Sequence, residues 1–258
     1  MLQSGITILS FILGICVGSF LLVVVTRLAE NKSFLSGRSA CDACGHTLSP
    51  FDLVPLFSYI LLKGHCRYCH SVLSPFYWIV ELVTGFIFAL TSLSLMPLLP
   101  SVLFFEMLIG MWFVIGGLEV IFFSDLWYGY IPDGATILIG IIGILHAWQF
   151  HALFSSLFAG IGAGLFFLLL LVGTKGRGMG WGDVKYVVAM GFLLGIGSTL
   201  VGLYIAFITG ALVALALVIF HKMKLRGSTI PFGPFLVFGT LAALTYGEVL
   251  WKWYLHFI

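Results

Sequence analysis

Long apolar stretches, separated by short polar segments, follow one another along almost the whole chain. A transmembrane helix needs about 20 predominantly apolar residues, and this pattern predicts eight such helices. We expect them at residues 5–26, 76–96, 101–123, 134–153, 155–173, 184–197, 199–220 and 232–251. The predicted fold class is therefore an all-α polytopic membrane protein with one small cytosolic insertion between the first two helices.

The composition agrees with a membrane protein and excludes an ordinary soluble enzyme. Only 9% of the residues are charged and the mean hydropathy is +1.16, whereas soluble domains have about 25% charged residues. The first apolar segment has no basic stretch before it and no A-x-A-like cleavage site. We therefore expect this segment to stay in place as a membrane helix rather than to be removed as a signal peptide.

The basic residues are distributed unevenly over the predicted loops. Lys252 is the one basic residue expected on one side of the membrane. The others fall in three loops on the opposite side: Arg27, Lys32, Arg38, Lys63, Arg67, then Lys175, Arg177, Lys185, then Lys222, Lys224 and Arg226. Because basic loops stay on the cytoplasmic side, we expect these three loops in the cytoplasm and both termini outside.

Residues 28–75 form the predicted insertion and contain two CxxC pairs, CDAC at 41–44 and CRYC at 66–69. Two such pairs can supply the four thiolates of a tetrahedral structural zinc site, which makes this a zinc-binding insertion with the ligands Cys41, Cys44, Cys66 and Cys69. Cytosolic thiols stay reduced, which disfavours disulfides; a redox pair and metal-free cysteines remain as alternatives. The neighbouring His46, His65 and His70 are not needed as ligands. Cys16 lies within the first predicted helix, where it is expected to be a small packing residue.

Two aspartates are expected at the cytoplasmic ends of membrane helices. Asp125 lies in FFSDLWYGYIPD and Asp183 in GMGWGDVK. A carboxylate in the membrane is costly, by about 2.5–3.5 kcal/mol at its centre, and two carboxylates at one depth can share a proton and activate water for amide hydrolysis. The alternative is that Asp183 caps the start of its helix. Asp133 is interpreted as an N-cap, with catalysis as the less favoured alternative.

Glycines near these residues suggest close backbone approaches. Gly180 and Gly182 have no Cβ and could let an extended substrate run beside Asp183. Two pairs with GxxxG spacing, Gly14 with Gly18 and Gly191 with Gly195, would allow neighbouring helices to pack closely. Chance spacing in a glycine-rich chain explains each GxxxG pair equally well.

The ordered set of motifs resembles the type IV prepilin peptidases, which are intramembrane aspartyl proteases of the GxGD type. The resemblance covers nearly the whole chain. It is carried by GSFLLVVVTRL at 18–28, CDACGHTLSPFDLVPLFSYILLKGHCRYC at 41–69, VELVTG at 80–85, SDLWYGYIPD at 124–133, GMGWGDVK at 178–185 and IPFGPFLVFG at 230–239.

This resemblance implies a function and a set of site residues. The family cleaves the leader peptide of prepilins or pseudopilins after a glycine on the cytoplasmic face, with Asp125 and Asp183 as the catalytic pair. Many members then methylate the new N-terminal residue with S-adenosylmethionine, a function associated with the N-terminal cytosolic region, where Glu81 and Gly64 are the candidate cofactor-binding residues. The family commonly has Asn at the position of Leu22 and Pro at that of Ala29; these departures leave the protease motifs unchanged.

The expected organisation has three parts: a first membrane helix (1–27), a cytosolic tetracysteine zinc domain that is also the candidate methyltransferase region (28–75), and a seven-helix membrane domain with the protease site (76–258). The expected partners are a prepilin or pseudopilin and the lipid bilayer of a bacterial inner membrane, with no nucleic acid; the sequence leaves the oligomeric state open. The alternatives are a peptidase without methyltransferase activity, a proton-coupled transporter and a non-catalytic zinc-bearing assembly factor.

Overall fold

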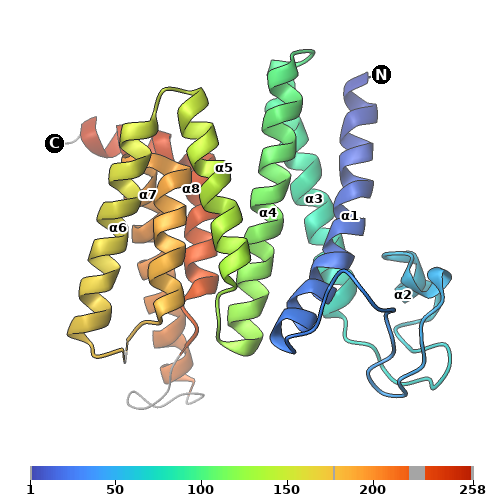
Figure 1. The fold of residues 1–258 in the computed structure, drawn as a ribbon. Coiled ribbons are helices and arrows are strands. Elements are labelled where there is room, and N and C mark those ends of the chain that lie inside the picture. Colours follow the sequence, from blue (N-terminus) through green and yellow to red (C-terminus); the bar gives the residue numbers. More distant parts are fainter. Residues whose placement is uncertain (1, 177, 221–229, 257–258) are drawn as a thin grey trace. The chain divides into compact units, whose positions relative to one another are not determined.

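The computed structural model describes residues 2–176, 178–220 and 230–256, and within these it contains helices and no named strand (Figure 1). Two isolated β-bridges join Ala40 to Thr47 and His65 to Val72. The helices, in chain order, are α1 (Leu2–Ala29), η1 (Pro50–Leu53), α2 (Phe57–Leu61), α3 (Phe76–Leu95), η2 (Met96–Leu98), α4 (Val102–Tyr128), α5 (Asp133–Gln149), α6 (Leu153–Gly173), α7 (Trp181–Ile219) and α8 (Gly233–His256).

The predicted all-α membrane fold is confirmed by these helices. Six helices of the described residues are long and apolar enough to cross a membrane, and α5 is a shorter apolar helix of 17 residues. The 39-residue α7 combines two of the predicted segments, and Gly195 interrupts it with φ 71° and ψ 178°. The Met190 side chain lies against Gly202, so the second part of α7 returns alongside the first.

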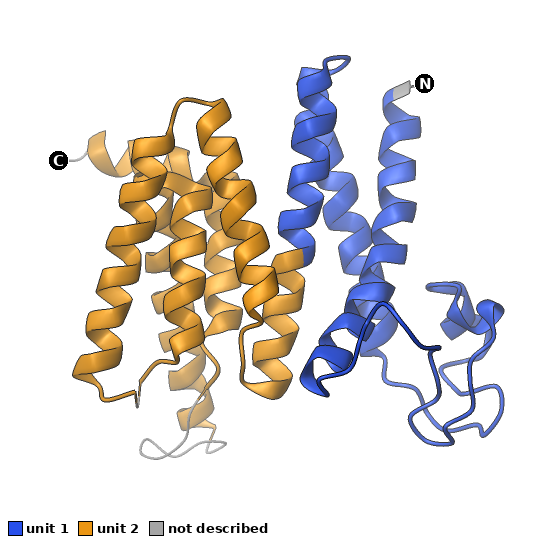
Figure 2. Cartoon of the chain, viewed as in Figure 1, with its two compact units in different colours: residues 1–116 blue, residues 117–258 orange. Residues whose placement is uncertain are grey.

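The chain forms two compact units, residues 1–116 and residues 117–258 (Figure 2). In the first unit, α1 packs against α3 through the first predicted glycine pair. A Cβ on Gly14 would lie 2.8 Å from the Gly85 Cα atom, and one on Gly18 would lie 2.7 Å from the Thr84 Oγ1 atom. Gly14 also faces Phe88 while Gly18 faces Glu81, so the two helices run antiparallel.

In the second unit, the first part of α7 packs against α5, α6 and α8. Gly191 lies against Gly160 of α6, which explains the small residue there. Gly195 instead takes the positive φ that ends the first part of α7, a conformation that favours glycine. The buried Tyr186 hydroxyl and Thr240 Oγ1 of α8 are 2.7 Å apart and form a hydrogen bond, which connects the first part of α7 to α8.

Two expectations about local structure were wrong. The predicted spans end at 123 and begin at 184, whereas α4 continues to Tyr128 and α7 begins at Trp181, so both aspartates lie inside helices. Cys16 is exposed on α1 rather than packed in the interior. Arg177, Lys222, Lys224 and Arg226, on which part of the topology prediction depends, lie outside the described residues.

Candidate active site and metal centre

Asp125 lies in the last turn of α4 and is only 7% exposed. Its Oδ2 atom accepts a hydrogen bond of 2.7 Å from the backbone N–H of Gly233, the first residue of α8. A Cβ at position 233 would lie 2.6 Å from that oxygen. Glycine therefore lets the start of α8 approach the carboxylate, a role that was missed although its motif IPFG was noted in the sequence.

Asp183 is the third residue of α7 and is also 7% exposed. Its Oδ2 atom accepts a hydrogen bond of 2.8 Å from the backbone N–H of Gly180, which precedes the helix. This bond stabilises the start of α7, as the capping alternative expected. Because the capping hydrogen bond is accepted by Oδ2, the Oδ1 atom stays available to bind water or substrate.

The second unit contains both carboxylates. The connection that follows α4 packs against the first turn of α7, although 57 residues separate the two aspartates in the sequence. Among the described contacts, a backbone N–H holds one oxygen of each side chain, which leaves the other oxygen for water or substrate. A buried pair of adjacent carboxylates can share one proton and so offer an acid and a base at the same place.

The connection between α4 and α5 packs against the first turn of α7. A Cβ on Gly182 would lie 3.0 Å from the Ile131 Cβ atom, so this glycine serves helix packing rather than an open substrate path. Pro132, not Asp133, is the N-cap of α5. Asp133 instead forms a partly exposed salt bridge of 2.7 Å with Lys185.

The four cysteines of the two CxxC pairs lie together in the first unit, with their sulfur atoms all within 4.8 Å of one another. The Sγ atoms of Cys41 and Cys69 are 3.9 Å apart. A tetrahedral zinc site with bonds of about 2.3 Å has sulfur atoms about 3.8 Å apart. The donor set and its spacing therefore fit a zinc ion.

The two pairs have matching backbone turns. The Gly45 N–H donates to the Cys41 carbonyl at 2.8 Å, and the His70 N–H donates to the Cys66 carbonyl at 3.0 Å. Backbone N–H groups of Cys44 and Ala43 lower the pKa of Cys41 to about 6, which favours the thiolate that a metal requires. The pKa of Cys44 is raised instead, to about 11, by burial and by the neighbouring thiols of Cys69 and Cys41.

The neighbouring histidines have other contacts. The His46 ring packs against Tyr68 in a tilted arrangement with the ring centres 3.8 Å apart, and the His65 Nδ1 atom is 2.7 Å from the Lys63 carbonyl.

Asp52, between the two pairs, was missed in the sequence. Its carboxylate is 3% exposed and accepts hydrogen bonds from the Ser49 N–H and hydroxyl, the Arg67 Nε–H at 2.6 Å and the Tyr68 hydroxyl at 3.2 Å. Burial opposes its ionisation, but these hydrogen bonds bring the pKa of Asp52 down to about 2. Asp52 therefore joins the segment after the first pair to the turn of the second pair as a carboxylate that is ionised at neutral pH.

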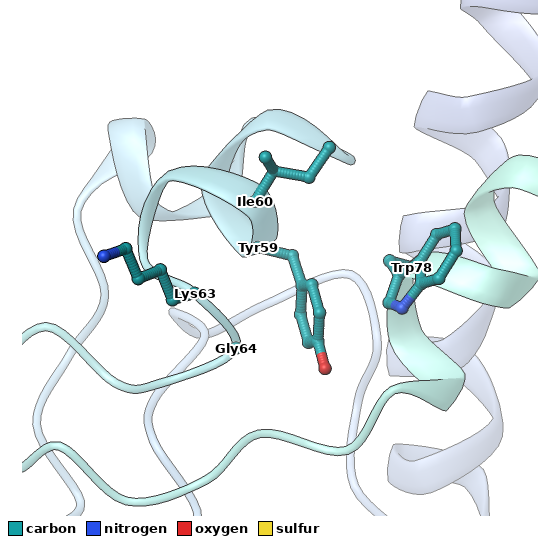
Figure 3. Close-up of a pocket in the computed structure, with 5 residues that line it drawn as sticks. All are labelled: Tyr59, Ile60, Lys63, Gly64 and Trp78. Atoms are coloured by element: carbon teal, nitrogen blue, oxygen red, sulfur yellow. The ribbon is translucent and has the colours of Figure 1, made fainter.

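Glu81 and Gly64 lie in different settings. Glu81 is buried in α3, where its Oε2 atom accepts a hydrogen bond of 2.8 Å from the Leu56 N–H. Gly64 has a φ of +71° and lines a hollow of about 240 Å³ with Tyr59, Ile60, Lys63 and Trp78 (Figure 3). Glu81 is not among the residues that line this hollow.

Comparisons with known proteins agree with this arrangement. The model of the bacterial peptidase A24 N-terminal domain matches residues 12–95, and that of the type IV leader peptidase family matches residues 112–215. A prepilin leader peptidase/N-methyltransferase of Bacillus subtilis is 30% identical, with 95% of this chain and 96% of that protein covered.

Two further relatives carry the same name. The protein of Aeromonas salmonicida is 28% identical, with 97% of this chain and 94% of that protein covered, and that of Burkholderia pseudomallei is 31% identical, with 92% and 84% covered. No solved structure matches the chain. With the two carboxylates inside the matched region and relatives that align over nearly their whole length, the chain belongs to the type IV leader peptidase family.

Proposed function

We propose that this protein cleaves the leader peptide of type IV prepilins or pseudopilins after a glycine, at the cytoplasmic face of the inner membrane. The observation that carries this proposal is the pair of buried carboxylates, Asp125 and Asp183, which lie at the end of α4 and the start of α7 in the same compact unit. The family supports a peptide substrate. The basic loops support a cytoplasmic site with both termini outside.

The two carboxylates would hydrolyse the peptide without a covalent intermediate. The ionised member takes a proton from a water molecule, and the resulting nucleophile adds to the carbonyl carbon of the scissile bond. The protonated member donates a hydrogen bond to the carbonyl oxygen and then gives a proton to the leaving amine. The N–H groups of Gly233 and Gly180 hold one oxygen of each carboxylate in place for these steps.

A cleavage assay tests the proposal directly. Purified protein in detergent is incubated with a prepilin encoded in the same genome, and the products are identified by gel shift and mass spectrometry. Replacement of either acid, Asp125→Asn or Asp183→Asn, should lower the rate by about 10²–10⁴-fold, as for loss of a general acid or base. Full activity in either variant would remove that residue from the catalytic pair.

A transporter would give a different result. Transporter sites lie near the middle of the membrane, at broken helices or internal repeats, whereas Asp125 and Asp183 lie at helix ends. A chain that cleaves no cognate prepilin, yet moves protons across a vesicle membrane, would favour a transporter; a chain that does neither would favour an assembly factor.

N-methylation of the new N-terminus with S-adenosylmethionine is a second proposed activity, supported by the names of the relatives. The hollow at Gly64 offers the aromatic faces of Tyr59 and Trp78, which suit a sulfonium cation. Its volume of about 240 Å³ is below the roughly 300–1,000 Å³ of whole-ligand sites, so these residues alone do not accommodate the cofactor. The assignment of Gly64 and Glu81 to this cofactor therefore stays a prediction.

The same mass spectrometry tests methylation. Added S-adenosylmethionine should increase the mass of the mature product by one methyl group, and the mass should stay unchanged without the cofactor. Cleavage with no added methyl group under both conditions would leave a peptidase without methyltransferase activity.

Zinc is the proposed metal of the four cysteines, which form a closed four-ligand site typical of structural zinc. Bound zinc would hold the two CxxC turns together in a segment with little interior of its own. Protein purified without chelators should carry about one zinc per chain, Cys44→Ser should lose it, and Cys16→Ser, which changes an exposed cysteine of α1, should keep it. Absence of zinc from the unmodified protein would contradict this proposal.

A further inference from the structure

The segment of residues 50–61, which contains η1 and α2, exposes large apolar side chains although it belongs to a polar insertion. Phe57, Ile60 and Leu61 of α2 are 64%, 67% and 79% exposed. Such side chains, close together outside the membrane helices, mark an interaction surface.

The contacts of Glu81 locate this segment along the membrane helices. Leu56, directly before α2, donates its N–H to Glu81. On α1, Gly18 lies against the same residue, because a Cβ on Gly18 would lie 3.1 Å from the Glu81 Cα atom. Glu81 lies five residues after the start of α3 and Gly18 lies eleven residues before the end of α1, which correspond to about 7.5 Å and about 16.5 Å along the helix axes. The segment therefore lies beside α1 and α3 rather than beyond their ends.

A pair of aromatic side chains joins the segment to α3. Tyr59 packs near Trp78, with the ring centres 6.3 Å apart (Figure 3), and Ile79 and Val83 on the following turns of α3 are exposed. Tryptophan and tyrosine concentrate at membrane–water interfaces. Lys63, which follows α2 and lines the same hollow, can keep its ammonium group in water while its stem lies on apolar surface.

We propose that the 50–61 segment is inserted into the boundary between lipid headgroups and acyl chains, with Phe57, Ile60 and Leu61 facing the lipid. The bilayer covers these side chains, because the segment lies beside the apolar helices α1 and α3 and packs against α3 through Tyr59 and Trp78. Glu81 anchors the segment through the Leu56 N–H, and Asp52 of η1 joins it to Arg67 of the second CxxC turn. The cysteine cluster is thereby held at the membrane surface, a conclusion that does not depend on the proposed activities.

Photocrosslinking in lipid nanodiscs tests this insertion. The photoreactive residue p-benzoylphenylalanine replaces Ile60 or Leu61 in the full-length protein, and mass spectrometry identifies the adducts. Leu35 is the matched control, because it is 84% exposed and lies in a stretch whose carbonyls bind Arg27 near the end of α1. Variants are compared only if their circular dichroism and gel-filtration profiles match those of the unmodified protein.

Lipid adducts at positions 60 and 61 should exceed those at 35 on the order of tenfold, since only an interfacial segment reaches the acyl boundary. Equal yields at all three positions, or no lipid adducts at 60 and 61, would overturn the proposal. Adducts from 60 and 61 to other parts of the protein would also overturn it, by showing that a protein surface covers the segment.

Discussion

The backbone N–H of Gly233 donates a hydrogen bond of 2.7 Å to the Oδ2 atom of Asp125, so the first residue of α8 holds a carboxylate at the end of α4. These residues are 108 positions apart in the sequence. The contact means that the orientation of Asp125 depends on α8 as well as on its own helix.

Gly233→Ala should strongly lower peptidase activity. The added Cβ would lie 2.6 Å from Oδ2 of Asp125, so either the carboxylate or the start of α8 must move. Displacement of a catalytic group by about 1 Å can cost about 10²-fold in rate, and we expect a loss of that order in the prepilin cleavage assay. Gly162→Ala in α6 is the control, because a Cβ there meets nothing within 4 Å; equal effects of the two changes would contradict the prediction.

Asp133→Asn should leave most of the activity. Both side chains of the Asp133–Lys185 salt bridge are exposed to solvent, and exposed pairs contribute about 0–1 kcal/mol. Even if this whole energy were lost from the stabilisation of the transition state, the rate would fall by at most about fivefold. The initial rate of prepilin cleavage measures this. A loss of about 10²-fold or more would instead place Asp133 among the catalytic acids, the alternative left open by its sequence.

The main helices and the chemical groups could be predicted from the sequence because each has a local signature. An apolar run marks a membrane helix, and paired CxxC motifs mark a sulfur cluster. A break was expected between segments 184–197 and 199–220, and α7 is interrupted close to it, at Gly195, which had been interpreted as a helix-packing glycine. Asp125 and Asp183 stood out because charges are rare in such a chain.

The groups that hold these residues in place could not be predicted in the same way. Gly233 and Leu56 act through their backbone N–H groups, which every residue except proline has. Asp52 is one acid in a polar insertion, and its contact with Arg67 exists only after both CxxC turns have folded. Such long-range contacts leave no periodicity or spacing in the sequence.

Asp52→Asn should weaken metal binding by the cysteine cluster. Asparagine keeps an oxygen acceptor but loses the charge that pairs with Arg67 beside Cys66, and loss of groups that support metal ligands costs about 10–100-fold in affinity. Competition with a chromogenic zinc chelator measures the change. Asp42→Asn is the control, because Asp42 lies inside the first CxxC pair but its Oδ2 atom receives only a long hydrogen bond of 3.5 Å, from Tyr77.

The effect of Asp52→Asn should be nearly constant between about pH 5 and pH 8. The pKa of Asp52 is lowered to about 2 by its hydrogen bonds, with burial opposing, whereas an unfolded aspartate titrates near 3.9. A lowered folded-state pKa gives stability that is present above about pH 4 and is lost as the pH falls towards about 2. A ratio of the two zinc affinities that changes steeply near neutral pH would show that a different group is responsible.

Glu81→Gln and Glu81→Leu should differ in their effect on the 50–61 segment. Glutamine keeps a carbonyl oxygen that can accept the Leu56 N–H, whereas leucine removes the acceptor and leaves a partly buried donor unpaired, at a cost of up to about 1–3 kcal/mol. We therefore expect amide hydrogen exchange in residues 55–62, measured in lipid nanodiscs, to be faster in Glu81→Leu and nearly unchanged in Glu81→Gln.

A prepilin methylation assay on the same two variants separates anchoring of the segment from cofactor binding. Normal exchange together with lost methylation in Glu81→Gln would assign the carboxylate to the methyl-transfer site, whereas parallel changes in exchange and methylation in Glu81→Leu alone would assign it to anchoring the segment.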